Sequence, residues 1–247
     1  MAERPEWEEF LATAAIVGQE QLSGSEAVTN PWKLTLQKDG IKRYALWKNA
    51  QGMMNGYLEG WTYEIAAYRL DKFLGLNMIP PTVERRFKGN KGSCQLWIED
   101  VTSLRKLEKE NERVPADGIV AWDRAIYLER AFDNLIANED RNQGEFLITR
   151  DWRMILIDHS RAFRTSKKFI TGLIFSEKSP GGPQLMKELP RAFVDKIKAL
   201  DYGMIRAAVG EYLTDKEVQS MLIRKPLILQ EIDKLIDRQG ESNVLYQ

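Results

Sequence analysis

The sequence is poor in the residues that build soft metal sites and nucleophilic catalytic groups. Its 247 residues include one cysteine, Cys94, and one histidine, His159. A single cysteine cannot form a disulfide within the chain, and a structural zinc site needs about four cysteine or histidine ligands. The sequence therefore argues against a disulfide framework, against structural zinc, and against catalysis by a serine–histidine or cysteine–histidine pair.

An excess of one charge and long apolar runs are also missing. Lysine plus arginine and aspartate plus glutamate each total 36, so the formal net charge is +0. Such a chain offers no overall field to hold a polyanion, and a nucleic-acid partner is not expected. No uncharged apolar run approaches the roughly 18 to 20 residues of a membrane span. The first ten residues carry glutamates where a secretory signal carries positive charge, so we expect a soluble, cytoplasmic protein.

Residues 1–101 are predicted to be rich in β-structure. They contain the extended runs ATAAIVGQEQ, WKLTLQ and IKRYALWK, and Asp39-Gly40 between the last two is typical of a tight hairpin turn. The small, polar segment QLSGSEAVTNP separates the first two runs and is expected to form a loop. Apolar residues at helical spacing predict a helix over 61–74 that ends at Gly75, and TVERRF and SCQLWIE follow as extended segments.

Residues 102–247 are predicted to be mainly helical. The periodicity predicts helices at 123–138, 191–201, 202–213 and 215–240, with a break or kink at Pro226. Between the first two helices, EFLIT and MILID are predicted to be short strands. Hydrophobic residues make up 43% and charged residues 29%, which are ordinary values for a globular protein. We therefore expect an α+β fold, either one large domain or two lobes that share a cleft.

Lys48 begins a series of polar residues that could carry chemistry. It ends the run YALWK and follows the loop that contains Ser23, Gly24 and Ser25. A cation on a strand beneath a small-residue loop can hold phosphate oxygens, while backbone N–H groups of the loop complete the cradle. Taken alone, Lys48 could equally be an exposed lysine at the end of a strand.

Three acidic residues follow Lys48 in order. Glu64 lies sixteen positions later on the predicted helix, where its carboxylate could hold Lys48 or simply be solvated. Asp140 in NEDRNQGE and Asp158 in LIDHS flank the two short strands. Such strands can bring two carboxylates to one edge, where one orients a hydroxyl group and the other holds a divalent cation. Each aspartate, taken singly, could instead cap a turn.

These segments resemble the atypical kinases. NEDRNQGEFLI followed by MILIDHSRAF is similar to the catalytic loop and metal-binding segment of HipA-like kinases, phosphoinositide kinases and the Golgi casein kinase family. YALWK and YEIAAYRLDKFLGLNMIPPTVE are similar to the strand lysine and helix glutamate of the same group. The resemblance covers approximately residues 16–165. It implies a two-lobed protein-kinase-like fold, with a β-rich N-lobe of residues 1–101 and a helical C-lobe of residues 102–247.

The resemblance also implies a role for each residue. Lys48 would contact the α- and β-phosphates of the nucleotide and pair with Glu64. Asp140 would face the acceptor hydroxyl, and Asp158 would bind Mg²⁺. The segment that contacts the adenine would consist of Gln95, Leu96, Trp97, Ile98 and Glu99.

The sequence departs from the family pattern in the DRNQGE segment. Atypical kinases often have histidine where this chain has Asn142, and a metal-binding asparagine where it has Glu145. The Golgi casein kinase group is similar in having an acidic residue near the second position, so Glu145 is a candidate metal ligand. The phosphate loop contains one glycine, which makes it less permissive than a glycine-rich loop.

The implied activity is ATP- and Mg²⁺-dependent phosphoryl transfer to a hydroxyl group, with Mn²⁺ as an alternative metal. A protein serine or threonine is favoured as the acceptor through the HipA-like resemblance, while a lipid head group or a small molecule stays open. The altered DRNQGE segment leaves a pseudokinase or scaffold as the alternative. A third reading is the transfer of another group from ATP, because a fold does not determine its chemistry. The sequence does not reveal the acceptor, the oligomeric state or a regulator.

Overall fold

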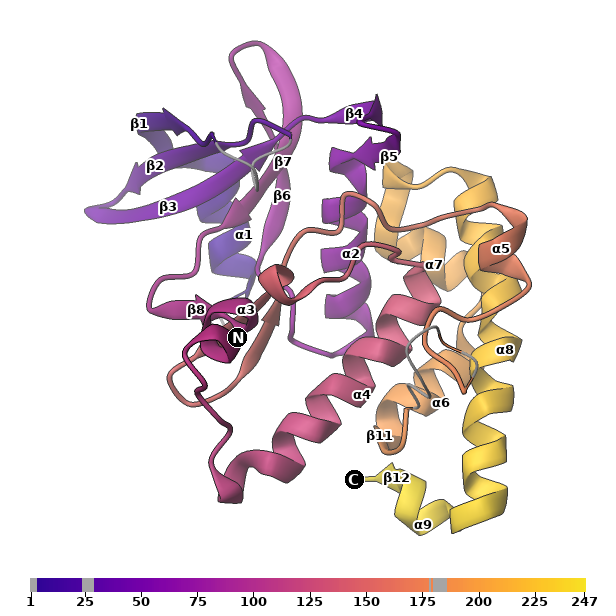
Figure 1. Ribbon diagram of the computed structural model, residues 1–247. Helices are drawn as coiled ribbons and strands as arrows, with labels where there is room; N and C mark the ends of the chain where they lie inside the picture. The colour runs from indigo at the N-terminus through magenta and orange to yellow at the C-terminus, as the bar shows by residue number, and fades with distance from the viewer. Residues whose placement is uncertain (1–3, 24–28, 178, 180–185) are drawn as a thin grey trace.

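The structure, a computed structural model, describes residues 4–23, 29–177, 179 and 186–247. Figure 1 shows an antiparallel sheet at one end of the molecule, a largely helical part at the other, and α2 between them. This mixed architecture confirms the predicted α+β class. Gly24 and Ser25 of the predicted phosphate loop lie outside the described residues. No helix among the described residues has the length and apolarity needed to cross a membrane.

The N-terminal sheet has the strand order β1-β2-β3-β7-β6, with every neighbouring pair antiparallel. Its strands are β1 (Ala15–Gln21), β2 (Trp32–Lys38), β3 (Ile41–Lys48), β6 (Thr82–Phe87) and β7 (Asn90–Leu96). The turn between β2 and β3 is the predicted Asp39-Gly40 pair, whose φ angles of 50° and 76° fit the hairpin turn that matches the strand twist.

Helix α1 (Arg4–Thr13) corrects the start of the first predicted strand. The run ATAAIVGQEQ was expected to be extended throughout, but Ala12 and Thr13 complete this helix and β1 begins at Ala15. Phe10, Leu11 and Ala14 explain the difference, because their helical spacing buries all three against the sheet. The acidic N-terminal segment therefore packs on the β-rich part.

An ion pair anchors α1 to the helix on the other face of the sheet. Arg4 Nη2 lies 2.6 Å from Asp71 Oδ2, and the side chains are 6% and 0% exposed. Asp71 Oδ1 also accepts the backbone N–H groups of Met78 and Ile79. Burial raises the pKa of Asp71, and Arg4 opposes this effect.

Replacing Arg4 with methionine should lower the free energy of unfolding by about 3 kcal/mol, because it leaves a buried carboxylate without its cation. Urea unfolding at neutral pH measures the change. Lys38→Met is the matched control, since it breaks a 2.6 Å ion pair with Glu9 of the same helix on the surface. We expect that variant to unfold close to wild type. Equal losses in both variants would contradict an anchoring role for Arg4.

Strand β3 has one face toward α1 and the other toward α2 (Trp61–Leu74). Ala45 and Trp47 are buried in the core that α1 completes. Since alternate residues of a strand point to opposite faces, Lys48 points toward α2. Gly92 allows this pairing of β3 with β7, because a Cβ there would lie 2.4 Å from the carbonyl oxygen of Lys48. Helix α2 ends at Gly75, as predicted, with a left-handed φ of 82°.

A hairpin that sequence reasoning missed precedes α2. It consists of β4 (Gln51–Met54) and β5 (Tyr57–Gly60), joined by Asn55-Gly56 with φ angles of 50° and 85°. Asn-Gly is a strong turn signal, but the flanking residues do not alternate between apolar and polar over a useful length. One residue of this hairpin, Glu59, lines the cavity at the candidate site.

The helical part contains the predicted short strands. Strands β10 (Met154–Leu156), β9 (Phe146–Thr149) and β8 (Val101–Ser103) form a small antiparallel sheet. The helices are α3 (Leu104–Lys109), α4 (Ile119–Ile136), α5 (Lys167–Ile170), α6 (Arg191–Ala199), α7 (Tyr202–Val209), α8 (Asp215–Gln239) and α9 (Glu241–Val244). Three short 3₁₀ segments, 116–118, 143–145 and 210–212, and the short parallel strands β11 (Leu189–Pro190) and β12 (Leu245–Tyr246) complete the described elements.

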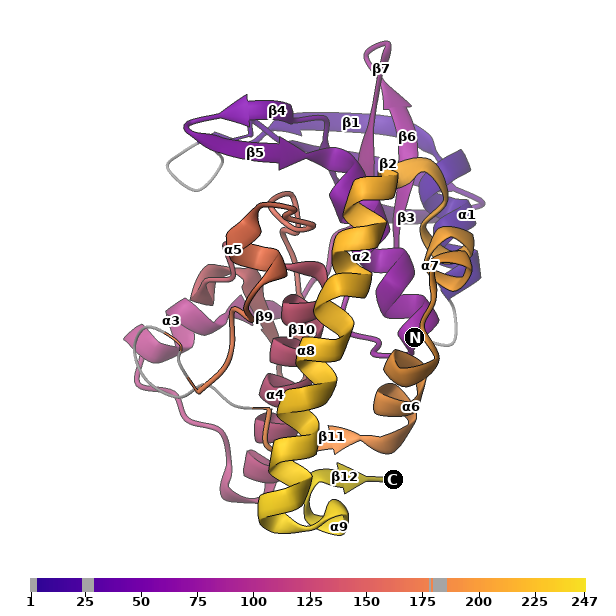
Figure 2. The same ribbon diagram turned by 90° about the vertical axis from the view of Figure 1, so that its right-hand side faces the viewer.

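Helix α8 is not broken at Pro226, where the sequence predicts a break or kink. It is 25 residues long in all, includes Pro226 and runs along α4 (Figure 2). Pro226 lies on the exposed face of the helix, where the carbonyl that lacks its usual N–H partner can be hydrated. Ile228, Ile232 and Leu235 are buried on the opposite face, and their packing compensates for the local loss.

Candidate active site

Lys48 meets two carboxylates between the sheet and the helical part. Its Nζ lies 2.8 Å from Glu64 Oε1 and 2.9 Å from Asp158 Oδ1. Lys48 is 7% exposed and Glu64 is 3% exposed, so the readings of an exposed strand-end lysine and a solvated helix glutamate are wrong. Burial acts to lower the pKa of Lys48, but the two carboxylates outweigh it and raise the pKa.

Lys48 and His159 together stabilise the ionised form of Glu64. Burial acts to raise its pKa, yet Lys48 and the contacts with His159 keep it well below its usual range. The backbone N–H of His159 donates to Glu64 Oε2 at 3.0 Å. Glu64 therefore connects β3 to the segment that follows β10.

Asp158 adopts an unusual backbone conformation two residues after β10 ends. Its φ of 56° lies in the left-handed region, which is uncommon for residues other than glycine, asparagine and aspartate. Ser160 Oγ donates to Asp158 Oδ1 at 2.9 Å, and the carbonyl of Ser160 accepts the N–H of Gly60 from the hairpin. The Asp158 side chain is 41% exposed, so it remains accessible to a ligand.

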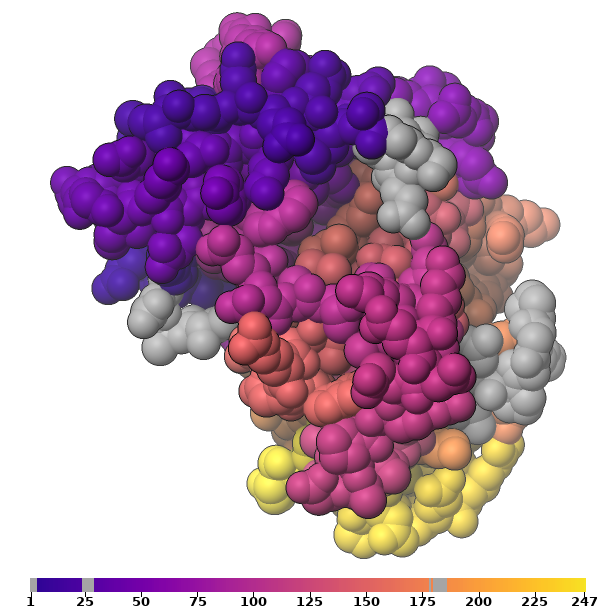
Figure 3. Space-filling view, turned by 60° about the vertical axis from the view of Figure 1, so that its left-hand side comes forward, coloured from indigo at the N-terminus to yellow at the C-terminus, as the bar shows by residue number. Residues whose placement is uncertain are grey.

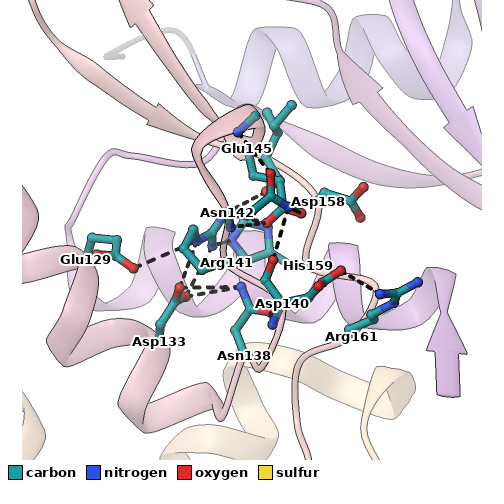
Figure 4. A network of polar contacts seen from close by, with 12 residues as sticks. Glu129, Asp133, Asn138, Asp140, Arg141, Asn142, Glu145, Asp158, His159 and Arg161 are labelled. Carbon is teal, nitrogen blue, oxygen red and sulfur yellow. Dashed lines mark hydrogen bonds and ion pairs between the residues drawn. The ribbon is translucent and has the colours of Figure 1, made fainter. Parts of the chain in front are cut away.

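Arg141 organises the loop that carries Asp140 (Figure 4). Its guanidinium group donates to both carboxylate oxygens of Asp133 at 2.8 and 3.2 Å, and to the carbonyl of Ile157 at 2.8 Å. It also lies 2.9 Å from His159 Nε2. Since arginine can only donate, Nε2 must accept and the ring proton is on Nδ1. Sequence reasoning did not assign Asp133 or Arg141 to the site.

Asp140 lies at the other side of this loop, toward Arg161 (Figure 4). Arg161 Nη1 donates to Asp140 Oδ2 at 2.7 Å. Burial raises the pKa of Asp140, an effect that Arg161 reduces and that Asp158 increases. The carboxyl group is therefore closer to accepting a proton at neutral pH than a solvated aspartate is.

Glu145 is buried beside the same loop and does not point to solvent. It is 8% exposed and forms a reciprocal capping arrangement with Asn142 at the start of the 143–145 turn. Burial raises the pKa of Glu145 to about 9, because Asp158 and Asp140 add to the effect of burial and Arg141 only partly opposes it. Glu145 therefore holds a proton at neutral pH.

The acidic residues line one cavity of about 380 Å³. Figure 3 shows the surface hollowed between the sheet and the helical part. The charged residues that line the cavity are Glu59, Arg105, Asp140, Glu145, Asp158 and Arg161. Thr29, near the end of the predicted loop, lines it as well, whereas Ser23, two residues after β1, is exposed.

The residues predicted to contact adenine lie at the end of β7. Gln95 is buried and donates to Thr82 Oγ1 at 2.9 Å. The backbone N–H groups of Leu96 and Trp97 donate to the carbonyls of Pro81 and Tyr44. Those two N–H groups are thus already used within the protein. A base that accepts a hydrogen bond from the backbone would have to receive it from the N–H groups after them, at Ile98 and Glu99.

The carboxylates suit a hard divalent cation. Asp158 offers carboxylate oxygens, and Glu145 would offer them once it releases its proton. Mg²⁺ typically binds through one or two carboxylates together with phosphate oxygens and water. Among the described residues, no group of three or more histidine, cysteine, aspartate or glutamate side chains could hold a metal alone. One or two carboxylates suit a metal that also binds phosphate oxygens.

Comparison with known proteins supports the fold alone. No protein-family model matches the chain, and no curated protein matches it. Among solved structures, hydra Fam20 with sugar is similar over 99% of this chain and 92% of its own, with a TM-score of 0.70 and 14% identity. Golgi casein kinase with Mn and ADP bound is similar over 99% and 78%, with a TM-score of 0.67 and 16% identity.

A third similar structure is the Helicobacter pylori proinflammatory kinase CtkA, over 93% of this chain and 98% of its own, with a TM-score of 0.62 and 12% identity. These likenesses confirm the predicted kinase-like fold. The finer resemblances to HipA-like and phosphoinositide kinases, and the lobe boundary at residue 101, stay predictions.

Proposed function

We propose that this protein transfers the γ-phosphoryl group of ATP to a hydroxyl group. The observation that supports the proposal is that Lys48 lies within 3 Å of both Glu64 and Asp158, and that Asp158 and Asp140 line the same cavity. Phosphoryl transfer needs a positioned cation for the phosphates, a carboxylate for the metal and a carboxylate for the acceptor hydroxyl. These residues supply all of them.

Each side chain has a defined part in this proposal. Lys48, held by Glu64, neutralises and orients the α- and β-phosphates. Asp140 accepts a hydrogen bond from the acceptor hydroxyl and takes its proton as transfer proceeds. Asp158 and Glu145 would hold Mg²⁺ or Mn²⁺, which when bound neutralises the charge that develops on the transferred group. A solved structure of similar fold contains Mn and ADP, which is consistent with this assignment.

We favour a protein serine or threonine as the acceptor, on the resemblance seen in the sequence, and keep a lipid head group or small molecule as alternatives. A scaffold that binds no nucleotide would need no ion pair between Lys48 and Glu64. The presence of Asp140 and Asp158 beside this pair favours catalysis over a nucleotide-binding pseudokinase. Transfer of a nucleotidyl group would leave the same residues in place. These activities share a fold and are distinguished by the product that forms from ATP.

The test is product analysis with ATP labelled at the γ or at the α position, in the presence of Mg²⁺ or Mn²⁺. With γ-labelled ATP we expect the label on inorganic phosphate or on the protein itself. With α-labelled ATP we expect no label on the protein. Asp140→Asn is the negative control. Transfer of the α label would show that the protein transfers a nucleotidyl group and not a phosphoryl group. Binding of ATP without turnover would indicate a pseudokinase.

Glu145→Gln should stabilise the metal-free protein at high pH. With a pKa raised from 4.5 to about 9, folded Glu145 keeps a proton that the unfolded chain releases above about pH 4.5. Its contribution to stability therefore falls as pH rises from about 4.5 to 9, by at most about 1.4 kcal/mol per pH unit. Glutamine keeps the capping hydrogen bond and does not titrate.

Urea unfolding at pH 5 and pH 8 with a chelator present measures this effect. The advantage of Glu145→Gln over wild type should grow with pH, while the exposed Glu112→Gln control should follow wild type. An advantage independent of pH would mean that Glu145 is ionised in the folded protein. In active protein, Glu145→Gln should also raise the Mg²⁺ concentration needed for half-maximal turnover, because Glu145 can release its proton to become a charged ligand when the metal binds and glutamine cannot.

A further inference from the structure

Arg161 connects the β4–β5 hairpin to the predicted catalytic aspartate. Its Nε donates to Glu59 Oε1 at 2.6 Å and its Nη1 donates to Asp140 Oδ2 at 2.7 Å. The guanidinium carbon lies 4.2 Å from the centre of the Tyr57 ring. Two partners on the hairpin thus hold an arginine whose free end reaches Asp140.

The anchor on the hairpin is buried. The Glu59 side chain is 1% exposed and that of Arg161 is 15% exposed, whereas the Asp140 side chain is 42% exposed. A charge-assisted hydrogen bond out of bulk water is stronger and better oriented than one on the surface. Because the guanidinium group is planar and rigid, fixing Nε against Glu59 also fixes the direction of Nη1. The accessible carboxylate is therefore oriented by the two buried groups.

Arg164 provides an internal comparison. It lies three residues after Arg161 and joins the same two segments, donating to the carbonyl of Leu58 at 2.8 Å and pairing with Glu139. Glu139 precedes Asp140 and does not line the cavity. Arg164 already connects the hairpin to this loop. A need to hold the two segments together therefore does not explain why Arg161 contacts both of them. Its distinguishing feature is that it ends on the residue that faces the cavity.

We propose that Arg161 is a positioning residue, anchored by Glu59, that orients the Asp140 carboxylate toward the acceptor hydroxyl. It binds Oδ2, so Oδ1 is the oxygen presented to the acceptor. The proton of the hydroxyl passes to Asp140 and never to Arg161, which stays protonated. This inference rests on the proposed phosphoryl transfer.

The test compares four variants in ATP turnover with Mg²⁺ and water as the acceptor. Arg161→Gln should lower kcat about 30- to 100-fold with less than about a threefold change in KM for ATP, since small errors in the placement of a reacting group are costly. Glu59→Gln should lower kcat about tenfold, and Arg161→Lys should recover part of the loss. Glu139→Gln, the matched control, should stay within about twofold of wild type.

A double variant tests whether Arg161 acts through Asp140. In the Asp140→Asn background, Arg161→Gln should cause no further loss of kcat, because there is no carboxylate left to orient. An additive loss, an unchanged kcat in Arg161→Gln, or an equal loss in Glu139→Gln would overturn the inference. If Arg161→Gln does not fold, the kcat of Glu59→Gln is the test: a loss of about tenfold would support the inference, and an unchanged kcat would overturn it. A wild-type protein without turnover would overturn the proposed function, and this inference with it.

Discussion

Asp158→Asn is expected to reduce ATP turnover at least about 100-fold at saturating Mg²⁺, with the fold unchanged. The substitution removes the carboxylate that faces both Lys48 and the cavity, and with it the ligand charge that would hold the metal on the phosphates. Asparagine suits the φ of 56° at this position, because it is among the residues that tolerate the left-handed region best. Its amide oxygen can still accept the hydrogen bond from Ser160.

The measurement is the rate of ADP formation over a range of Mg²⁺ concentrations, with the unfolding transition recorded in parallel. Asp151→Asn is the matched control, since it removes an equal charge from the exposed turn between β9 and β10. That variant should turn over ATP like wild type. Turnover by Asp158→Asn that equals wild type at high Mg²⁺ would remove Asp158 from the metal site.

Lys48 and Glu64 should behave as a coupled pair in both activity and stability. Each of Lys48→Met and Glu64→Gln should lower kcat/KM for ATP by about 100-fold, and the double variant should lose little more, because one function is lost only once. Lys48→Met also leaves two facing carboxylates without their cation, and one of them, Glu64, is buried. We expect it to lower the free energy of unfolding by about 3 kcal/mol or more.

The free energy of unfolding of the double variant shows whether Lys48 and Glu64 are coupled. Glu64→Gln removes the charge that Lys48→Met has left unpaired, so Lys48→Met/Glu64→Gln should be more stable than Lys48→Met alone. The glutamine carbonyl can still accept the N–H of His159. Urea unfolding of the four proteins completes the cycle. Additive losses in stability and in kcat/KM would mean that the 2.8 Å contact carries no energetic coupling.

Local sequence signals predicted those elements whose causes are local. Asp39-Gly40 forms its turn and Gly75 ends its helix because short-range sterics select residues that accept a positive φ. The two short strands at 146–149 and 154–156 follow from their apolar runs. Helix α1 and the passage of α8 through Pro226 escaped prediction, since burial against distant segments outweighs local propensity in both.

The candidate site divides in the same way. The order of Lys48, Glu64, Asp140 and Asp158 in the chain was enough to predict a kinase-like arrangement, and the structure brings the first two into contact as expected. Glu59 and Arg161 carried no sequence signal, because a glutamate in a hairpin and an arginine in a loop are usually solvated. They are 102 positions apart, and nothing in either local segment indicates that they meet.

The sequence by itself determined the fold class, the turns and the residue types available for phosphoryl transfer, because these depend on backbone sterics, periodicity and the chemistry of single side chains. Tertiary structure decided which of those side chains act together. It gave Lys48 a second partner in Asp158, raised the pKa of Glu145 by burial, and brought Arg161 into a hydrogen bond with Asp140. The protonation and orientation of these groups depend on burial and on charges brought together from distant segments, and neither is a property of the local sequence.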